Sequence, residues 1–365
     1  MYECRTTPTP MPKPVAISHF LPALAIPTSD QTLLRELAAT LVTHNLEQYN
    51  TLCVTKDGQP DGRIWKPVRK TEGLRIYRER PSAPHDAARL IPSLLLLGSA
   101  VGTLDDVMYA VVAPTDASLK IKSFYIRDGV VESKVLEELV DPTVEEPFHH
   151  VSVQWRLYET CDYVTLETAG VMETPWGERV GYTVSHSVGF ATFPALTELG
   201  IPRGNRSVCS LYRQKAHGTV ECYTRGFFDT STSVFALQTI ATQWLSVSRH
   251  MKCAQMKKLA WHLRQPHDDV DEMPLLTTKT KRAAITCRVC TKSFTLFLPG
   301  SKKYCQSCDA AVCSRCCTKK LVYVLSPDHS SVLETKGRIC SRCVHKANKS
   351  DAVAIARDEV IRMSW

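Results

Sequence analysis

The sequence predicts an α+β protein in which an antiparallel sheet and a long helix are followed by a small cysteine-rich module. Between His149 and Asp229, apolar and polar residues alternate with the period of two that is typical of half-buried strands. From Ser233 to Arg264, apolar residues recur at steps of three and four, as in an amphipathic helix. Nine of the 15 cysteines then fall between Cys287 and Cys343.

The size and composition are those of a globular protein. The 365 residues are 44% apolar and 22% charged, enough for one large domain and a small module. The longest apolar stretch, Leu90 to Val101, is about half the ~20 residues that a membrane-spanning helix needs. The N-terminus lacks a basic segment followed directly by an apolar core, so we expect no secretory signal and a cytoplasmic protein.

The first half of the chain contains weaker signals. Residues 1–19, rich in Thr and Pro, are expected to form a loose segment. Ser29 and Asp30 suit a helix cap, and apolar residues from Leu33 to Val42 follow at helical spacing. Further elements are expected as strands at Ile64–Val68 and Leu74–Arg78 and as a short helix at Leu104–Val112.

Two hairpins are predicted in the second half of the sheet. The turn TPWGE separates strands at 163–172 and 179–188, and KAHG separates strands at 207–214 and 219–228. After the long helix, residues 265–280 contain two prolines, four acids and no periodicity, which predicts a linker. Residues 350–365 are expected to contain a short C-terminal helix.

The order of these elements resembles the START-like helix-grip fold, a curved antiparallel sheet wrapped around a C-terminal helix. The stretches VGYTVSHSV and LYRQKAHGTVECYTRGF are also similar to that family, and the resemblance covers residues 20–264. It implies a lipid-sized apolar cavity between the sheet and the last helix, which would hold a lipid. The alternative is a shell of the same fold whose centre is packed solid and which serves as a scaffold.

Four cysteine pairs predict two metal sites. A C-x-x-C pair forms a tight turn that presents two thiolates to one tetrahedral ion, and two pairs complete a zinc site. Eight thiolates therefore predict two structural Zn²⁺ ions, and a cytoplasmic chain makes disulfides a poor alternative. Cys317 is out of register and is expected to be spare. The pairs are Cys287 and Cys290, Cys305 and Cys308, Cys313 and Cys316, and Cys340 and Cys343.

Residues 281–349 resemble a FYVE finger. A RING finger needs a Cys-x-His-x2-Cys element, which is absent, and a PHD finger has histidine where this chain has Cys313 and an aromatic residue at the position of Arg338. Phe294, the spacing between the fourth and fifth cysteines and the sequence Arg-Ile-Cys at Cys340 are similar to the FYVE pattern. The resemblance implies a cross-braced finger, with Cys287, Cys290, Cys313 and Cys316 on one zinc and Cys305, Cys308, Cys340 and Cys343 on the other.

FYVE fingers bind phosphatidylinositol 3-phosphate, so the resemblance implies a peripheral position on endosomal membranes. Their R-(R/K)-H-H-C-R motif reads SKKYCQ here, and no W-x-x-D precedes Cys287, which puts selectivity for the 3-phosphate in doubt. Lys302, Lys303 and Arg338 are the candidate headgroup-binding residues; the alternative for Arg338 is that it only holds the finger together.

The loop before the basic motif inserts into the bilayer in FYVE fingers. Here that loop contains Leu296, Phe297 and Leu298, the candidate membrane-insertion residues. Large apolar side chains at a loop tip usually signify contact with a partner. The alternative is that Leu296 and Leu298 pack onto the large domain and the neighbouring lysines form a solvated face.

The charge of the finger indicates an anionic partner. Residues 281–349 contain 14 Lys and Arg against three Asp and Glu, whereas the whole chain has a net charge of +8. The positive charge is therefore concentrated on the finger, which suits an anionic or phosphoinositide-containing membrane. A nucleic acid or a histone tail, as for a PHD-like finger on a filled scaffold, is the alternative, and a third is a protein-interaction finger.

No residue is predicted to be catalytic. The sequence has no G-x-S-x-G, no P-loop and no dinucleotide-binding fingerprint. Zinc sites with four thiolates leave no open position for water, so they are expected to be structural. The sequence therefore predicts a non-enzymatic, zinc-binding adaptor associated with lipid or membrane.

Overall fold

The computed structural model describes most of the chain outside the linker. Residues 266–283, which include nearly all of the predicted linker, lie outside the described residues, and so do Leu296, Phe297 and Leu298. No helix in the described part of the chain is long and apolar enough to cross a membrane. The described residues are 16–52, 54–55, 58–71, 73–81, 93–229, 234–265, 284–294, 302–326 and 332–363.

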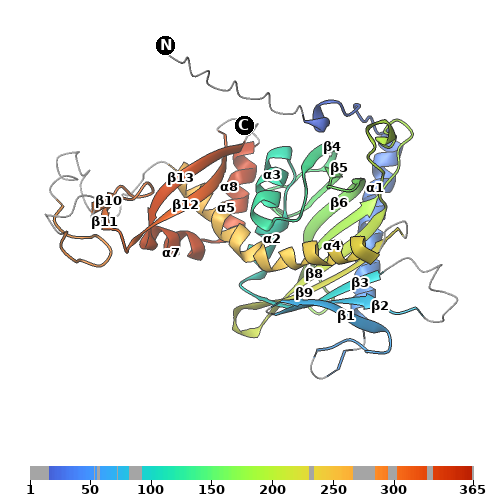
Figure 1. The fold of residues 1–365 in the computed structure, drawn as a ribbon, viewed down its shortest axis with the longest axis horizontal. Coiled ribbons are helices and arrows are strands. Elements are labelled where there is room, and N and C mark those ends of the chain that lie inside the picture. Colours follow the sequence, from blue (N-terminus) through green and yellow to red (C-terminus); the bar gives the residue numbers. More distant parts are fainter. Residues whose placement is uncertain are drawn as a thin grey trace, which may run out of the picture.

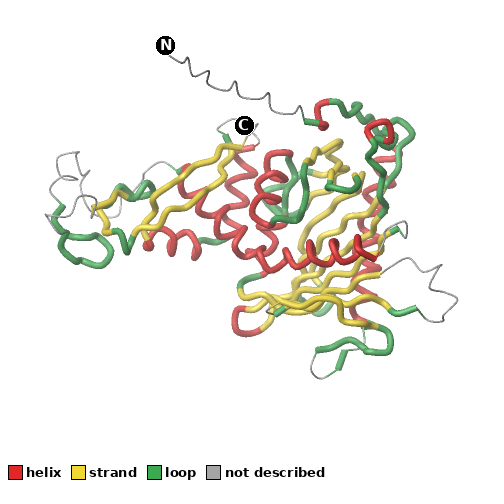
Figure 2. The backbone as a smooth tube through the Cα atoms, viewed as in Figure 1, coloured by secondary structure: helices red, strands yellow, loops and turns green. Residues whose placement is uncertain are grey.

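Nine strands form one antiparallel sheet in the order β1-β2-β3-β9-β8-β7-β6-β5-β4 (Figure 1). This sheet confirms the predicted α+β class, and Figure 2 shows it as the large block of strands on one side of the molecule. The strands are β1 (Trp65–Thr71), β2 (Leu74–Glu79), β3 (Ser93–Val101), β4 (Glu132–Val140), β5 (His150–Leu157), β6 (Asp162–Glu173), β7 (Arg179–Ser187), β8 (Arg206–Lys215) and β9 (Thr219–Phe228).

Both predicted hairpins are present. In the first, Glu173 of β6 pairs with Arg179 of β7; in the second, Lys215 of β8 pairs with Thr219 of β9. The second turn closes at Gly218, whose φ of 65° is in the left-handed region that glycine adopts without strain. The two hairpins place β6 to β9 side by side in the middle of the sheet.

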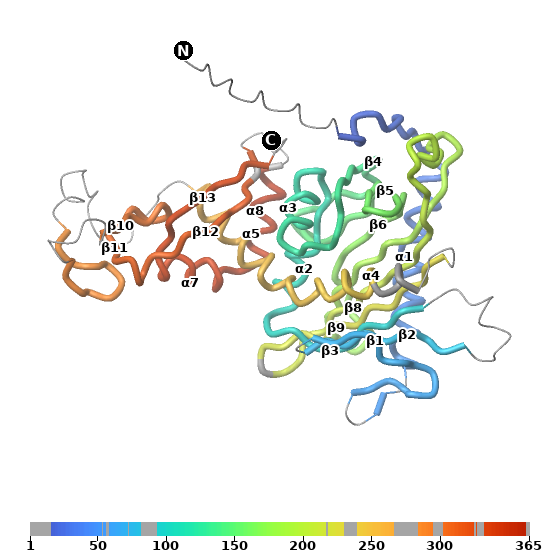
Figure 3. The backbone as a smooth tube through the Cα atoms, in the orientation of Figure 1, coloured from blue at the N-terminus to red at the C-terminus, as the bar shows by residue number. Residues whose placement is uncertain are grey.

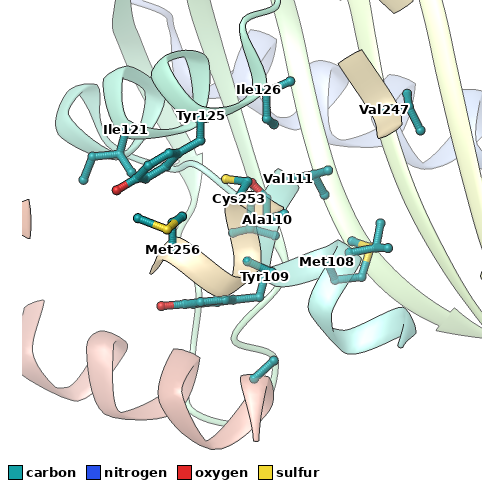
Figure 4. Close-up of a cluster of buried hydrophobic side chains, with 14 of the residues drawn as sticks. Met108, Tyr109, Ala110, Val111, Ile121, Tyr125, Ile126, Val247, Cys253 and Met256 are labelled. Atoms are coloured by element: carbon teal, nitrogen blue, oxygen red, sulfur yellow. The ribbon is translucent and has the colours of Figure 1, made fainter. Parts of the chain in front are cut away.

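Helices cover both faces of the sheet. Helix α1 (Thr28–Asn50) covers the outer face, where its Val42 packs in one cluster with Leu95 and Leu97 of β3. The inner face is covered by α2 (Leu104–Val111) and α5 (His250–Arg264), which pack against Leu94 and Leu96 of the same strand. Helix α3 (Asp116–Ile126) joins this inner layer, and Figure 4 shows its Tyr125 beside Met256 of α5.

In the part of the chain that forms the large sheet and its helices, three elements were not predicted: β3, α3 and β4. Strand β3 is buried on both faces, so its run of four leucines has no alternation to reveal it. Helix α3 begins with a capping box in which the Thr115 hydroxyl accepts from the backbone N–H of Ser118. Strand β4 is an edge strand of mixed burial with irregular register, which weakens the period of two.

The helical segment at 234–264 is divided rather than continuous. Between α4 (Val234–Trp244) and α5 the chain forms a 3-10 turn, η5 (Leu245–Arg249). Its two serines are weak helix formers, and the Ser248 hydroxyl donates to the carbonyl of Leu245 at 2.7 Å. The guanidinium of Arg249 donates to the carbonyl of Ile126, so the turn is also tied to the end of α3. The prediction of one unbroken helix is corrected accordingly.

In its described residues, the cysteine-rich segment with the chain that follows it forms two small hairpins and two helices, drawn in orange to red in Figure 3. Strand β10 pairs with β11, and β12 pairs with β13, all antiparallel. A helix is present where the short C-terminal one was predicted. The elements are β10 (Lys302–Tyr304), β11 (Ala311–Cys313), β12 (Cys317–Leu325), β13 (Val332–Cys340), α7 (Ser341–Lys349) and α8 (Ala352–Met363).

This segment packs on the layer of helices that covers the inner face. The indole N–H of Trp261 in α5 donates to Asp358 of α8 at 2.6 Å, and Arg264 forms an ion pair with Glu359 at 2.7 Å. On α3, the Tyr125 hydroxyl accepts from the backbone N–H of Tyr323 in β12 at 2.8 Å. A single cluster of buried side chains runs from the sheet through α2 and α5 into the cysteine-rich segment and α8.

A cavity of about 70 Å³ remains at this junction, lined among others by Tyr109, Lys257 and Tyr323. Ligand pockets usually have ~300–1,000 Å³, so this cavity is too small for a lipid.

Candidate metal centre

The eight paired cysteines gather in two groups of four. One group is Cys287, Cys290, Cys313 and Cys316; the other is Cys305, Cys308, Cys340 and Cys343. Within each group the four sulfur atoms lie within 4.8 Å of one another. The first and third pairs thus meet at one point and the second and fourth at another, which is a cross-braced arrangement.

Two similar turns position half of these thiols. After Cys287 the chain turns back so that the backbone N–H of Thr291 donates to the Cys287 carbonyl at 2.8 Å. After Cys305, the N–H of Asp309 donates to the Cys305 carbonyl at the same distance. Thr291 and Asp309 both have φ in the left-handed region, at 58° and 55°. Each turn brings the two sulfur atoms of its C-x-x-C pair to one side.

Strand ends and a helix start supply the other thiols. Cys313 ends β11, and its N–H donates to the Cys287 sulfur at 3.3 Å. Cys340 ends β13, and its N–H donates to the Cys305 sulfur at 3.2 Å. Cys343 lies in the first turn of α7, where the positive end of the helix dipole also favours a thiolate.

Backbone N–H groups stabilise the thiolate form. For Cys287, burial raises the pKa of the thiol, but hydrogen bonds from the N–H groups of Cys290, Cys313 and Val289 outweigh burial and lower the pKa to about 6. Since zinc binds the thiolate, this environment favours metal binding near neutral pH.

The spacing of the sulfur atoms fits tetrahedral zinc. A tetrahedron with Zn–S bonds of ~2.3 Å has neighbouring sulfur atoms ~3.8 Å apart. The sulfur atoms of Cys290 and Cys313 are 3.8 Å apart, and those of Cys308 and Cys340 are 3.9 Å apart. All four donors in each group are soft sulfurs, the set that structural zinc prefers. Cys317, next to Cys316, belongs to neither group.

Comparison with known families agrees with this geometry. Residues 277–349 match the FYVE zinc finger. The finger therefore binds two zinc ions, and the two cysteine groups provide a place for each. No curated protein matches the chain.

Three solved structures are similar to the part of the chain that contains the sheet. Human StAR-related lipid transfer protein 5 is 13% identical, with a TM-score of 0.42, over 61% of this chain and 98% of the other. The lipid transfer and protein localization domain of human StarD13 (DLC2) is 13% identical, with a TM-score of 0.37, over 63% and 98%. A STAR-related lipid transfer protein fragment from Xanthomonas axonopodis is 12% identical, with a TM-score of 0.37, over 53% and 99%.

The three predicted headgroup residues of the FYVE finger differ in their surroundings. Lys302 is half-buried: its ammonium donates to the carbonyl of Ala284 at 2.9 Å and lies 5.6 Å from the ring centres of both Phe294 and Tyr304. Lys303 is half-buried beside it, and Arg338 on β13 is exposed. Lys302 therefore has a structural role, while Arg338 is free to meet a ligand from outside.

Lys319 is a further basic residue at this place, which the sequence did not indicate. In the register of β12 and β13 it lies directly opposite Arg338, two pairs beyond Cys317 and Cys340. Like charges in directly opposed positions destabilise a sheet unless an anion compensates them. Burial raises the pKa of the Cys317 thiol, and the charges of Arg338 and Lys303 oppose this rise, so both lie near that cysteine. We call Lys303, Lys319 and Arg338 the basic face.

Proposed function

We propose that this chain is a non-enzymatic membrane adaptor whose FYVE finger attaches to anionic or phosphoinositide-bearing membranes and whose sheet holds a lipid on its inner face. The eight cysteines are the proposed zinc ligands, in the two groups described above. Four thiolates on each zinc would leave no open position for water, which supports a structural and not a catalytic metal. The basic face is the observation that carries the membrane assignment.

The basic face has the position that membrane attachment requires. It lies on the finger, whose hairpin β10–β11 is at the end of the molecule farthest from the sheet (Figure 1). A flat anionic surface can therefore approach it without meeting the sheet. Each basic residue near an anionic membrane contributes on the order of 1 kcal/mol, and Leu296, Phe297 and Leu298 are proposed to add apolar contact with the bilayer. A peripheral position on endosomal membranes follows from the same proposal.

The inner face of the sheet supports the lipid-holding part of the proposal. Gly181 of β7 faces α2, since a Cβ there would meet Met108, so Thr183 and Ser185 point to the same side. Both are only half-buried, and so is Val208 on β8, although β7 and β8 are central strands. Central residues on a covered face keep accessible surface only where the covering helices leave space. That space is the proposed lipid site.

The membrane proposal is tested by removing the basic face. In the variant Lys303→Gln, Lys319→Gln, Arg338→Gln, loss of roughly 3 kcal/mol of attraction should weaken binding to phosphoinositide-containing liposomes on the order of a hundredfold. The control removes three positive charges from the opposite end of the molecule, on the exposed residues Lys66, Arg69 and Lys70 of β1. Equal losses in the two variants in a sedimentation assay would contradict a specific basic face and leave net charge as the only determinant.

A further inference from the structure

The inner face of the sheet has an apolar and a polar half. The strands β2, β3 and β9 contribute apolar side chains to it, including Ile76, Leu94 and Val220. The strands β5, β6 and β8 contribute polar ones instead. The buried members of the polar half are His150, Ser152, Gln154, Arg156, Thr165, Glu167 and Ser210. Hydrogen bonds satisfy all of these residues except His150. Buried polar groups are costly unless they are paired or bind a ligand, so His150 and the net charge of the polar half require an explanation.

The charges of the polar half are not balanced. Its carboxylate, Glu167, accepts from Arg156 at 3.1 Å and lies 3.8 Å from Arg206. It also accepts from the hydroxyls of Thr165 and Ser185, at 2.7 and 2.6 Å. Glu167 is therefore fully occupied and compensates only one of the two guanidinium groups.

Helix α3 adds a third cation. This helix lies between β4 and the start of α5, because Asp116 of α3 accepts from the N–H of Val135 in β4 and the carbonyl of Ile126 accepts from Arg249. Lys122 on α3 is half-buried and is close enough to Arg156 and Glu167 for their charges to shift its pKa. No ion pair or hydrogen bond of its ammonium is found among the described residues. Burial, reinforced by Arg156, lowers the pKa of Lys122 to about 8, so the group still carries its proton at neutral pH. The carboxylate of Asp128, just after the end of α3, has the opposite effect and raises the pKa of Lys122.

Two buried imidazoles accompany this ammonium. His150 on β5 and His250 at the start of α5 are 5% and 6% exposed, and within the described part of the chain the Nδ1 atom of each has no hydrogen-bond partner. Burial, and then the charge of Lys122, lowers the pKa of both to about 3, so both rings are neutral. A neutral imidazole can donate one N–H to an anion without adding charge.

We propose that Lys122, His150 and His250 bind the acidic head of an amphiphile, a carboxylate or a phosphate monoester, whose chain lies in the space beside Thr183, Ser185 and Val208. This inference rests on the proposed lipid-holding function and names the class of lipid. The ammonium supplies the charge, the two imidazoles supply neutral donors, and the anion compensates the excess positive charge of the polar half.

The test compares three single-chain ligands by calorimetry on the full-length, zinc-loaded protein below their aggregation concentrations. They are oleate, oleoyl lysophosphatidate and oleyl alcohol, which differ at the head. At least one acid should bind about tenfold or more tightly than the alcohol, and the tighter acid identifies the head as carboxylate or phosphate. Oleyl alcohol binding as tightly as both acids would overturn the inference, while the lipid-holding proposal would stand. If none of the three binds, both fail.

Variants of α3 test whether Lys122 is responsible for the preference for an acidic head over the alcohol. In Lys122→Met the preference for the acid should fall to within about twofold of the alcohol, because a single charge-assisted contact is lost. The control is Lys120→Met, an exposed lysine on the same helix, which should keep the preference. A preference that survives in Lys122→Met places the acid elsewhere, for example on the finger, and overturns the assignment. The comparison of ligands on the unmodified protein decides the inference even if Lys122→Met does not fold.

Discussion

Cys316 and Cys317 are adjacent cysteines with different surroundings. The sulfur of Cys316 lies in a group of four, whereas Cys317 begins β12 and belongs to no group. Replacing a thiolate with the weaker serine ligand should cost a zinc ion only at the first position. We expect Cys316→Ser to bind one zinc ion per chain and Cys317→Ser to bind two, measured by elemental analysis of the purified proteins. A missing zinc in Cys317→Ser, or two in Cys316→Ser, would show that the ligand set is assigned wrongly.

The role of a residue could be predicted from the sequence where it depends on the spacing of residues close together in the chain. A C-x-x-C pair forms its own turn, so four pairs indicate two zinc sites without any knowledge of the fold. Lys319 carries no such signal. It meets Arg338, which lies 19 residues further along the chain, only through the register of β12 and β13. Nothing near Lys122 in the sequence distinguishes it from other helix lysines, because its surroundings depend on how α3 packs over the polar half of the sheet.

At the scale of elements, α8 joins the finger to the helices that cover the inner face of the sheet. Its Glu359 accepts from the Tyr109 hydroxyl of α2 at 3.2 Å and pairs with Arg264 of α5. The side chains of Arg264 and Glu359 are only 21% and 16% exposed, so water replaces these contacts poorly.

Removing the contacts of Glu359 should lower the free energy of unfolding. Glu359→Ala leaves Arg264 and Tyr109 without a partner and should destabilise the protein by about 1–3 kcal/mol in denaturant unfolding. The matched control is Glu334→Ala on β13, whose partners are Lys336, 82% exposed, and the solvent-exposed hydroxyl of Tyr323. It should cost less than about 1 kcal/mol. Equal costs for the two variants would mean that α8 does not hold the finger to the sheet.

Strands were predictable where apolar and polar residues alternate, even in β5, whose eight residues are all buried. The alternation in β5 to β9 and the turns TPWGE and KAHG locate five strands and two hairpins correctly. Strand β3 was missed because its leucines are apolar on both faces and leave no alternation. The turn η5 was missed because Ser248 and Arg249 bond to groups that the helical period does not reveal. Tertiary packing, not local propensity, decides these cases.

At the scale of the molecule, the finger and the sheet share one buried core. The cluster that includes Leu94 of the sheet and Met256 of α5 continues to Val322 and Ile339 of the finger. The sequence divides the chain at a linker and gives no sign of this contact, because residues far apart in the chain form it. The finger is therefore held in a fixed orientation, with its basic face exposed and the inner face of the sheet behind it.

The central claim is that this basic face attaches the protein to anionic membranes. It is tested most directly by sedimentation of the purified protein with liposomes that contain no phosphoinositide, the 3-phosphate form or other phosphoinositides, at low salt and at ~0.15 M salt. We predict pelleting with every phosphoinositide-containing liposome, stronger at low salt, because Lys303 and Tyr304 stand in place of the two histidines of the FYVE motif and the basic face acts through its charge. Absence of pelleting with all liposomes at both salts would contradict the claim and leave a finger that binds protein.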